Sequence, residues 1–501
     1  MSREREAKLT ASTQFRLPDL DEFMGGVSAA ALAERHLDAV YYDTEGLDLA
    51  RWGITLRHRT GEDGPPWTLK LPETQDGPTL VRRELSFDGP PGSVPEAAYD
   101  LLCAHARSRP LIPVARLHTD RTPVELRDAT GERLAEIDDD HVTVYQSQRQ
   151  TGEFREIEVE LLVSGQDHDR LLTATVDRLV TAGCHAGPPV PKLVRALGPP
   201  ALEPPELVVP SVDDKTTLEQ LVRHSLARSV TQMLHHDPGV RLGDDPEDVH
   251  QFRVGTRRLR SDLRTLASLL EPELVSQLRD ELRWLGAAVG AVRDTDVLAE
   301  RLRAQVETLP EPDVTGAQAL LAALASQADT ARVAMLAALR SQRYLMLVDA
   351  LVNAANDPPF LPTKQVDRPA ALTAASFVRR PWRQLTDAVA ALSDNPSDPE
   401  LHNVRILAKR CRYAAEAVAS VAGRHAGRFA AAITDVQTVL GDHQDTVIAE
   451  AWLRDAATTT PQGAVAAGEL ILIQRHQRTK LRAQWPRTWK KASAKELSSW
   501  I

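Results

Sequence analysis

The chain changes its hydrophobic period once, beside a proline-rich stretch, and this change divides it into two structurally different parts. Polar and apolar residues first alternate with the period of two that is typical of strands, in 53–59, 67–71, 79–87, 123–128, 133–138 and 155–162. Beyond about residue 214 the period is near 3.6, as in amphipathic helices. The prolines of 187–210 exclude a continuous helix between the two parts. We therefore predict an α+β chain, with antiparallel strands first and helices after them.

The same change of period sets the expected domain bounds. We predict a strand-rich domain at 1–198, a proline-rich linker at 199–213 and an all-helical domain at 214–501. Short helices are expected within the first domain, at about 96–107 and 167–182. The segment 356–369 breaks the helical pattern and divides the second domain into segments at about 214–355 and 370–501.

These two helical segments resemble each other. The sequence 248–263 matches 400–415, and 284–298 matches 436–449 with nearly the same offset. A repeat of this length is too long for a solenoid. It predicts two similar helical bundles related by a pseudo-twofold axis.

The bulk composition excludes several classes of protein. A net charge of -10 argues against a general nucleic-acid binder, so a polyanion site requires a local concentration of cations. No apolar run is long enough for a transmembrane helix, and a secretory signal is not expected at the charged start. Three widely spaced cysteines favour a reducing cytoplasm over a disulfide framework or a zinc site.

Charges of one sign gather on single faces of the predicted strands, because residues i and i+2 point to the same side. The acidic faces are Glu4 with Glu6, Glu136 with Asp138 and Asp140, and Glu156 with Glu158 and Glu160, while Arg57 and Arg59 share a basic face. Each face alone could be the solvated side of a strand. Together they favour a site, because neighbouring carboxylates repel unless a cation lies between them. Hard oxygen ligands select Mg²⁺ or Mn²⁺, and the basic strands would hold an anion of several charges.

The sequence Glu4-x-Glu6-x-Lys8 resembles the ExExK signature of the CYTH family, the triphosphate tunnel metalloenzymes. The likeness covers about 1–198, with further charges in the family's order at Arg57, Arg59, Lys70, Arg82, Glu84, Arg121, 136–140, Glu158, Glu160 and Lys192. It implies an eight-stranded antiparallel barrel that forms a tunnel. Members include inorganic, thiamine and RNA triphosphatases and class IV adenylyl cyclases. Pro191 departs from the serine that many members carry.

Carried onto this sequence, the resemblance implies a metal-dependent triphosphate site. The implied metal ligands are Glu4, Glu6, Glu84, Asp138, Asp140, Glu158 and Glu160, and the implied triphosphate ligands are Lys8, Arg57, Arg59, Lys70, Arg82, Arg121 and Lys192. The catalytic residues would be Lys8, Glu4 and Glu6, with a metal-activated water attacking the terminal phosphorus. Whether Lys8 binds phosphate, orients the water or assists proton transfer stays open.

A basic stripe with helical spacing runs through each repeat. The stripes consist of His250, Arg253, Arg257, Arg260 and Arg264, and of His402, Arg405, Lys409 and Arg412. A solvated face with i, i+4 ion pairs would need acids nearby, but 250–264 contains only Asp262 and 402–413 contains none. The stripes favour a polyanion, and they resemble the CHAD family over about 214–500. This resemblance implies two four-helix bundles with a basic groove that binds inorganic polyphosphate.

These features together predict hydrolysis of inorganic triphosphate in the barrel, with polyphosphate binding by the helical domain. The expected location is the cytoplasm, with association with polyphosphate granules left open. A non-catalytic polyphosphate scaffold and a CYTH-type adenylyl cyclase stay as alternatives. Neither stripe interleaves aromatic residues that could stack bases, which argues against a nucleic-acid partner. No membrane partner is expected, and no protein partner is indicated.

Overall fold

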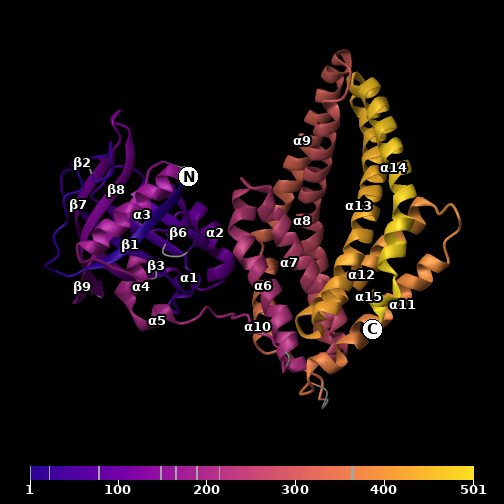
Figure 1. The fold of residues 1–501 in the computed structure, drawn as a ribbon, viewed down its shortest axis with the longest axis horizontal. Helices are drawn as coiled ribbons and strands as arrows, with labels where there is room; N and C mark the ends of the chain where they lie inside the picture. Colours follow the sequence, from indigo (N-terminus) through magenta and orange to yellow (C-terminus); the bar gives the residue numbers. More distant parts are fainter. Residues whose placement is uncertain are drawn as a thin grey trace. The chain divides into compact units, whose positions relative to one another are not determined.

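The computed structural model divides into two compact units, Met1–Glu206 and Leu207–Ile501 (Figure 1). It describes residues 2–21, 23–76, 79–146, 149–163, 166–187, 190–213, 215–362 and 366–501. Within these ranges the side chains of 2–5, 73–76, 79–81 and 166–168 are left out. Each unit has its own secondary structure and its own core.

The first unit contains a ten-stranded antiparallel sheet in its described residues. The strands are β1 (Ser2–Ala11), β2 (Ser28–Ala31), β3 (Arg35–Asp43), β4 (Thr55–Thr60), β5 (Trp67–Asp76), β6 (Thr79–Phe87), β7 (Ile112–Arg127), β8 (Arg133–Gln146), β9 (Arg149–Leu161) and β10 (His185–Ala186). Their order is β10-β1-β6-β5-β4-β3-β7-β8-β9, and β9 also pairs with β1. The prediction of eight strands is wrong for the whole sheet. Eight strands close the ring, while the short β2 and β10 extend it by pairing with the ends of β7 and β1.

The ring is charged inside and apolar on much of its outer face. In β9, Ile157 and Val159 are fully buried in an outer core that includes Leu171 and Leu179 of α3 (Gln166–Thr181). Glu158, between them in sequence, lines the interior. The predicted period of two is therefore confirmed, and the predicted helices form as α2 (Glu96–Ala106) and α3, beside the short α1 (Asp48–Arg51).

Two short helices, α4 (Lys192–Leu197) and α5 (Pro199–Leu202), end the first unit. Leu193 and Val194 of α4 belong to one apolar core with Tyr41 and Leu117 of the barrel. Ala201 of α5 is buried in the same core. Part of the proline-rich stretch is therefore packed on the barrel, and the boundary between the units follows Glu206.

The second unit consists of two sets of helices. They are α6 (Leu218–Leu242), α7 (Pro246–Thr265), α8 (Pro272–Val306), α9 (Glu311–Leu339) and α10 (Gln342–Asn356), then α11 (Ala370–Ala390), α12 (Asp398–Ala422), α13 (Arg424–Thr459), α14 (Ala464–Ala492) and α15 (Lys495–Ser498). In the described residues each set has four long helices, as the CHAD resemblance implies, and α10 gives the first set an extra helix of 15 residues where the second has the four-residue α15. The predicted break lies between α10 and α11.

The two sets of helices contact each other through α7 with α12 and through α8 and α9 with α13 and α14. Figure 1 shows α8 beside α9 and α13 beside α14, and a common core contains Leu302, Leu320, Leu453 and Leu470 of these four helices. Helix α7 contacts α12, so the two basic stripes meet between the repeats. In the described part of the chain, every helix is too short or too polar to cross a bilayer.

Candidate functional site

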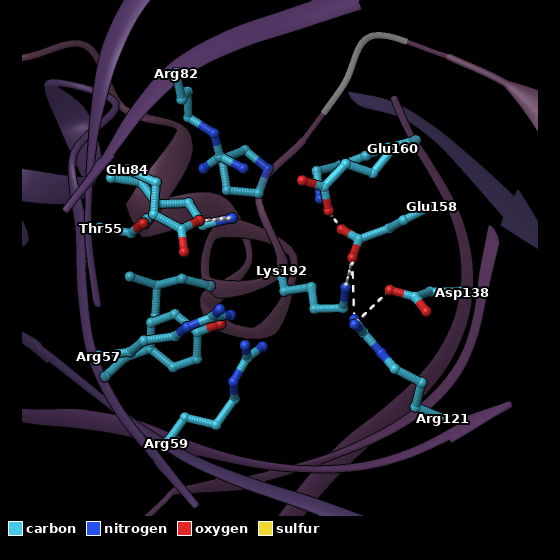
Figure 2. Close-up of a pocket in the computed structure, with 15 residues that line it drawn as sticks. Thr55, Arg57, Arg59, Arg82, Glu84, Arg121, Asp138, Glu158, Glu160 and Lys192 are labelled. Carbon is cyan, nitrogen blue, oxygen red and sulfur yellow. Dashed lines mark hydrogen bonds and ion pairs between the residues drawn. The ribbon is translucent and has the colours of Figure 1, made fainter. Parts of the chain in front are cut away.

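Charged side chains from the strands of the ring and from α4 line a cavity of about 130 Å³ inside the barrel (Figure 2). Its lining consists of Lys8, Tyr41, Thr55, Arg57, Arg59, Lys70, Arg82, Glu84, Arg121, Asp138, Glu158, Glu160, Pro191, Lys192 and Leu193. Seven of these residues are cations and four are acids. This excess of positive charge suits an anion with several negative charges.

Strand register explains why residues far apart in sequence meet in the cavity. Glu158 of β9 is paired with Lys8 of β1 on one side and with Asp138 of β8 on the other. Paired residues share a face and have Cβ atoms about 5 Å apart. Figure 2 shows Arg57 and Arg59 across the cavity from Glu158. The predicted acidic and basic faces therefore form two walls of one interior.

Lys8 and Glu6 form the part of the charge network that β1 supplies. Lys8 Nζ lies 3.1 Å from Glu6 Oε2 and also contacts Glu158, and Arg82 Nη2 donates to Glu6 Oε1 at 2.5 Å. Burial alone would raise the pKa of Glu6, but Lys8, Lys70 and Arg82 hold it well below its usual range. Glu6 lies behind these cations and does not line the cavity. The side chain of Glu4 lies outside the described residues.

Arg121 and Lys192 organise the acidic wall. Arg121 donates to both carboxylate oxygens of Asp140 at 2.8 Å and to Glu158 at 3.3 Å. Lys192 Nζ lies 2.9 Å from Asp140 and 2.6 Å from Glu158. Burial opposes ionisation of Asp140, but the two cations hold its pKa below the usual range. Asp140 is fully buried behind Arg121 and Lys192, so it positions them and does not line the cavity.

Sequence reasoning missed several members of this site. Tyr41 and Thr55 line the cavity, and Tyr41 is paired with Arg57 in the β3–β4 register. Glu156 is fully buried and lies 3.2 Å from both Lys192 and Arg195. The sequence grouped Glu156 with Glu158 and Glu160 on one acidic strand face but did not assign it a role in the site. Tyr41 gave no signal, because its strand reads as mainly apolar.

The carboxylates of the cavity are chemically suitable for a hard divalent cation. Burial raises the pKa of Asp138 to about 6, and its Oδ1 atom accepts no hydrogen bond. Glu158 and Glu160 follow on the neighbouring strand. The described side chains form no cluster of three His, Cys, Asp or Glu residues around a point where a metal could bind, since Arg121, Lys192 and Lys8 contact the acids instead. The donor atoms fit a metal, and these basic contacts would have to rearrange to admit it.

The helical unit has a second candidate site, a groove of about 270 Å³ between the two repeats. Its lining consists of His250, Arg253, Arg257, Arg293, Asp294, Val297, Leu298, Arg301, Arg405, Lys409, Asp445 and Ile448. Six of these residues are cations and two are acids. Arg301 of α8 was missed, because it lies outside the repeated segments, whereas Arg293 lies within 284–298 but was not assigned to a stripe.

The groove contains three of the five residues of the first predicted stripe and two of the four residues of the second. Arg253 and Arg257 of α7 meet Arg405 and Lys409 of α12. Arg253 Nη1 donates to Asp294 Oδ1 at 2.7 Å, so this acid braces the arginine. Burial, followed by repulsion from Arg405, Arg257 and Arg253, lowers the pKa of Lys409 to about 7. The groove therefore gathers cations that repel one another.

The other stripe residues lie away from the groove lining, namely His402, Arg260, Arg264 and Arg412. His402 Nδ1 lies 2.9 Å from Gln444 Oε1. Arg412 lies 3.4 Å from Glu416 and over the ring of Tyr413. Burial and the neighbouring Arg279 lower the pKa of Arg264 to about 10. The stripe on α7 thus continues beyond the groove into a second arginine cluster.

Comparisons with known proteins match both units. A CYTH domain model matches residues 2–175, and a CHAD domain model matches residues 224–454. An uncharacterized protein of Mycobacterium tuberculosis is 34% identical over 445 residues, which cover 84% of this chain and 83% of that protein. The solved CHAD domain from the plant Ricinus communis is 27% identical, with 57% of this chain and 95% of that one covered and a TM-score of 0.47. PptA from Streptomyces chartreusis is 24% identical, with 55% and 100% covered and a TM-score of 0.47.

Proposed function

The chain belongs to the family of proteins in which a CYTH domain is followed by a CHAD domain, and on this premise we propose that its barrel hydrolyses inorganic triphosphate with a divalent metal. CYTH domains belong to triphosphate-tunnel enzymes, which are triphosphatases or cyclases and are typically metal-dependent. The observation that carries the proposal is the cavity in which seven cations face four acids. We propose further that the helical unit binds inorganic polyphosphate.

In this proposal the basic wall binds and orients the phosphate chain. Arg57, Arg59 and Arg82 neutralise its charge and hold the terminal phosphoryl group in place for attack by water. Glu158, Glu160 and Asp138 are the residues that would hold the metal. Bound there, Mg²⁺ or Mn²⁺ would polarise the phosphoryl oxygens and lower the pKa of a bound water. Lys8 contacts Glu158, and with a metal on that carboxylate it would be released to bind the phosphate chain.

The cavity lining favours an inorganic chain over a nucleotide. Among its described residues, Tyr41, Pro191 and Leu193 are the main source of apolar surface, whereas a nucleobase is normally held by apolar and aromatic walls. We therefore rank triphosphatase above adenylyl cyclase. The carboxylates of the acidic wall favour hydrolysis over a non-catalytic scaffold, because a protein that only binds an anion requires no carboxylates in its site.

The groove in the helical unit supports the polyphosphate proposal. Cations of both repeats face one space, where a long anion can contact all of them. Such binding releases counterions and weakens as salt is added, as for other polyanions. In the described structure Cys103, Cys184 and Cys411 are buried and form no disulfide bond, which is in keeping with the cytoplasmic location that we propose.

A substrate panel tests the barrel. Phosphate release is measured from tripolyphosphate, thiamine triphosphate, ATP and long-chain polyphosphate, with Mg²⁺, with Mn²⁺ and with a chelator. We expect tripolyphosphate to have the highest kcat/KM and the chelator to abolish its hydrolysis. Cyclic AMP with pyrophosphate from ATP would instead identify a cyclase. Release from none of the four would leave the scaffold as the better explanation.

A further inference from the structure

The turn between β4 and β5 places an acid on one of the cavity's cations. The backbone N–H of Arg59 donates to Pro66 O at 2.8 Å and closes this turn. From within the turn, the Glu62 carboxylate contacts the Arg59 guanidinium. The Arg59 side chain is 15% exposed and the Glu62 side chain 28%, so the pair lies largely out of water. Arg59 lines the cavity, whereas Glu62 does not.

Glu62 supplies negative charge directly beside Arg59, in addition to the four acids that line the cavity. Burial and the neighbouring Arg57 lower the pKa of Arg59 to about 10, while Glu62 opposes this shift. Glu62 also adds to the attraction that favours the charged forms of Arg57 and Arg121. Its carboxylate therefore acts on three cations of the phosphate-binding wall, as a phosphate oxygen would.

The backbone before Glu62 holds it in this place. Gly61 has φ +99, and a Cβ atom there would lie 2.0 Å from the backbone oxygen of His36, so this residue is packed directly against β3. On the other side of Glu62, a Cβ atom on Gly64 would meet nothing within 4 Å. The start of the turn is thus anchored, the turn borders open space at Gly64, and the Glu62 side chain itself is partly exposed.

We propose that the Glu62 carboxylate competes with phosphate for the Arg59 guanidinium. Glu62 occupies this guanidinium in the empty barrel and has to leave before a phosphate group binds there. This inference rests on the proposed function, because it places the phosphate chain against Arg59. An anion with several charges can compensate for the lost ion pair through the other cations of the cavity. An anion with few charges cannot, so Glu62 favours long phosphate chains over single phosphate or sulfate ions.

The test compares Glu62→Gln with Asp63→Asn, which makes the same change in net charge one residue further along the turn. Asp63 is exposed, and no ion pair holds it in the described structure. Loss of one charge-assisted contact predicts that Glu62→Gln binds tripolyphosphate about tenfold more tightly in calorimetry without metal. KM should fall by a similar factor at unchanged kcat, because ground state and transition state gain equally. Asp63→Asn should change either value less than about twofold.

The outcomes separate this inference from the proposed activity. Equal effects of the two substitutions would mean that net charge alone acts, and weaker binding by Glu62→Gln would mean that Glu62 positions Arg59; either result overturns the competitor role. Tighter binding by Glu62→Gln, with no phosphate release by either protein, would support the competitor and overturn the hydrolase. If the proteins release phosphate but Glu62→Gln leaves the affinity for tripolyphosphate unchanged, the hydrolase is supported and the competitor is overturned. If neither the unsubstituted protein nor Glu62→Gln binds tripolyphosphate, both proposals are overturned.

Discussion

Individual charged residues are balanced differently in the two sites. In the barrel, acids and cations are paired, as with Lys70 and Glu84, whose Nζ and Oε2 atoms lie 2.9 Å apart. In the groove, cations mainly face other cations, and Lys409 responds with a pKa lowered to about 7. A ligand therefore has to replace existing ion pairs in the barrel, whereas in the groove it relieves repulsion that is already present.

The lowered pKa of Lys409 predicts that polyphosphate binding takes up protons. At pH 7.5 the free amine is largely neutral, and a bound polyanion raises its pKa, so roughly half a proton or more should enter per groove. Calorimetry in two buffers with different ionisation enthalpies measures this uptake. Lys409→Arg should bind polyphosphate without it, since arginine stays charged. Equal uptake by the variant would assign the proton to another group.

At the scale of elements, a buried ion pair joins α6 to the helices that follow it in the first repeat. Arg241 Nε donates to Asp237 Oδ1 at 2.7 Å, and both side chains are fully buried. The hydroxyl of Tyr344 in α10 donates to Asp237 Oδ2 at 2.6 Å, and Arg241 also donates to Leu339 O at the end of α9. This network holds α10, the helix that the second repeat reduces to four residues.

We expect Asp237→Asn to destabilise the helical unit by about 3 kcal/mol, because it leaves the Arg241 charge buried without its partner. Denaturant unfolding followed by far-UV circular dichroism measures this loss. The control is Asp280→Asn, which breaks a pair that is exposed on both sides and should cost less than about 0.5 kcal/mol. Similar losses for the two substitutions would contradict a special role for the buried network.

At the scale of the whole molecule, two compact units each contain their own cation-rich cavity or groove in a chain of net charge -10. The barrel concentrates charge by closing a sheet around it, and the helical unit does so by packing two repeats with their basic stripes together. Each site is complete within its unit. The two proposed activities should therefore be separable by substitution.

Glu158→Gln should lower phosphate release from tripolyphosphate at least about 100-fold while leaving polyphosphate affinity unchanged.

Arg253→Ala with Arg405→Ala should weaken polyphosphate binding at least about tenfold, reduce the slope of log Kd against log salt by about two, and spare hydrolysis. The control pair is Arg343→Ala with Arg454→Ala, which removes two cations exposed elsewhere on the helical unit. If this pair weakens polyphosphate binding equally, the groove is not the binding site.

Much of the architecture follows from local sequence alone. The change of period predicted both units, and the repeat predicted two similar sets of helices, because side-chain direction follows from backbone geometry within a few residues. The same alternation correctly grouped Glu158 with Glu160 and Arg57 with Arg59. It missed β3, and also the short β2 and β10, since four and two residues are too few to display a period.

What the tertiary structure decided is which of these charges meet and how deeply they lie. Register across strands put Asp140 behind Arg121 and left Asp138 on the cavity, although both share one face of β8. Helix packing admitted Arg253 to the groove and left Arg264 outside it, although both belong to one stripe. Periodicity along the chain determines the side on which a residue lies. Its partners and its burial depend on contacts with distant segments, which no local pattern contains.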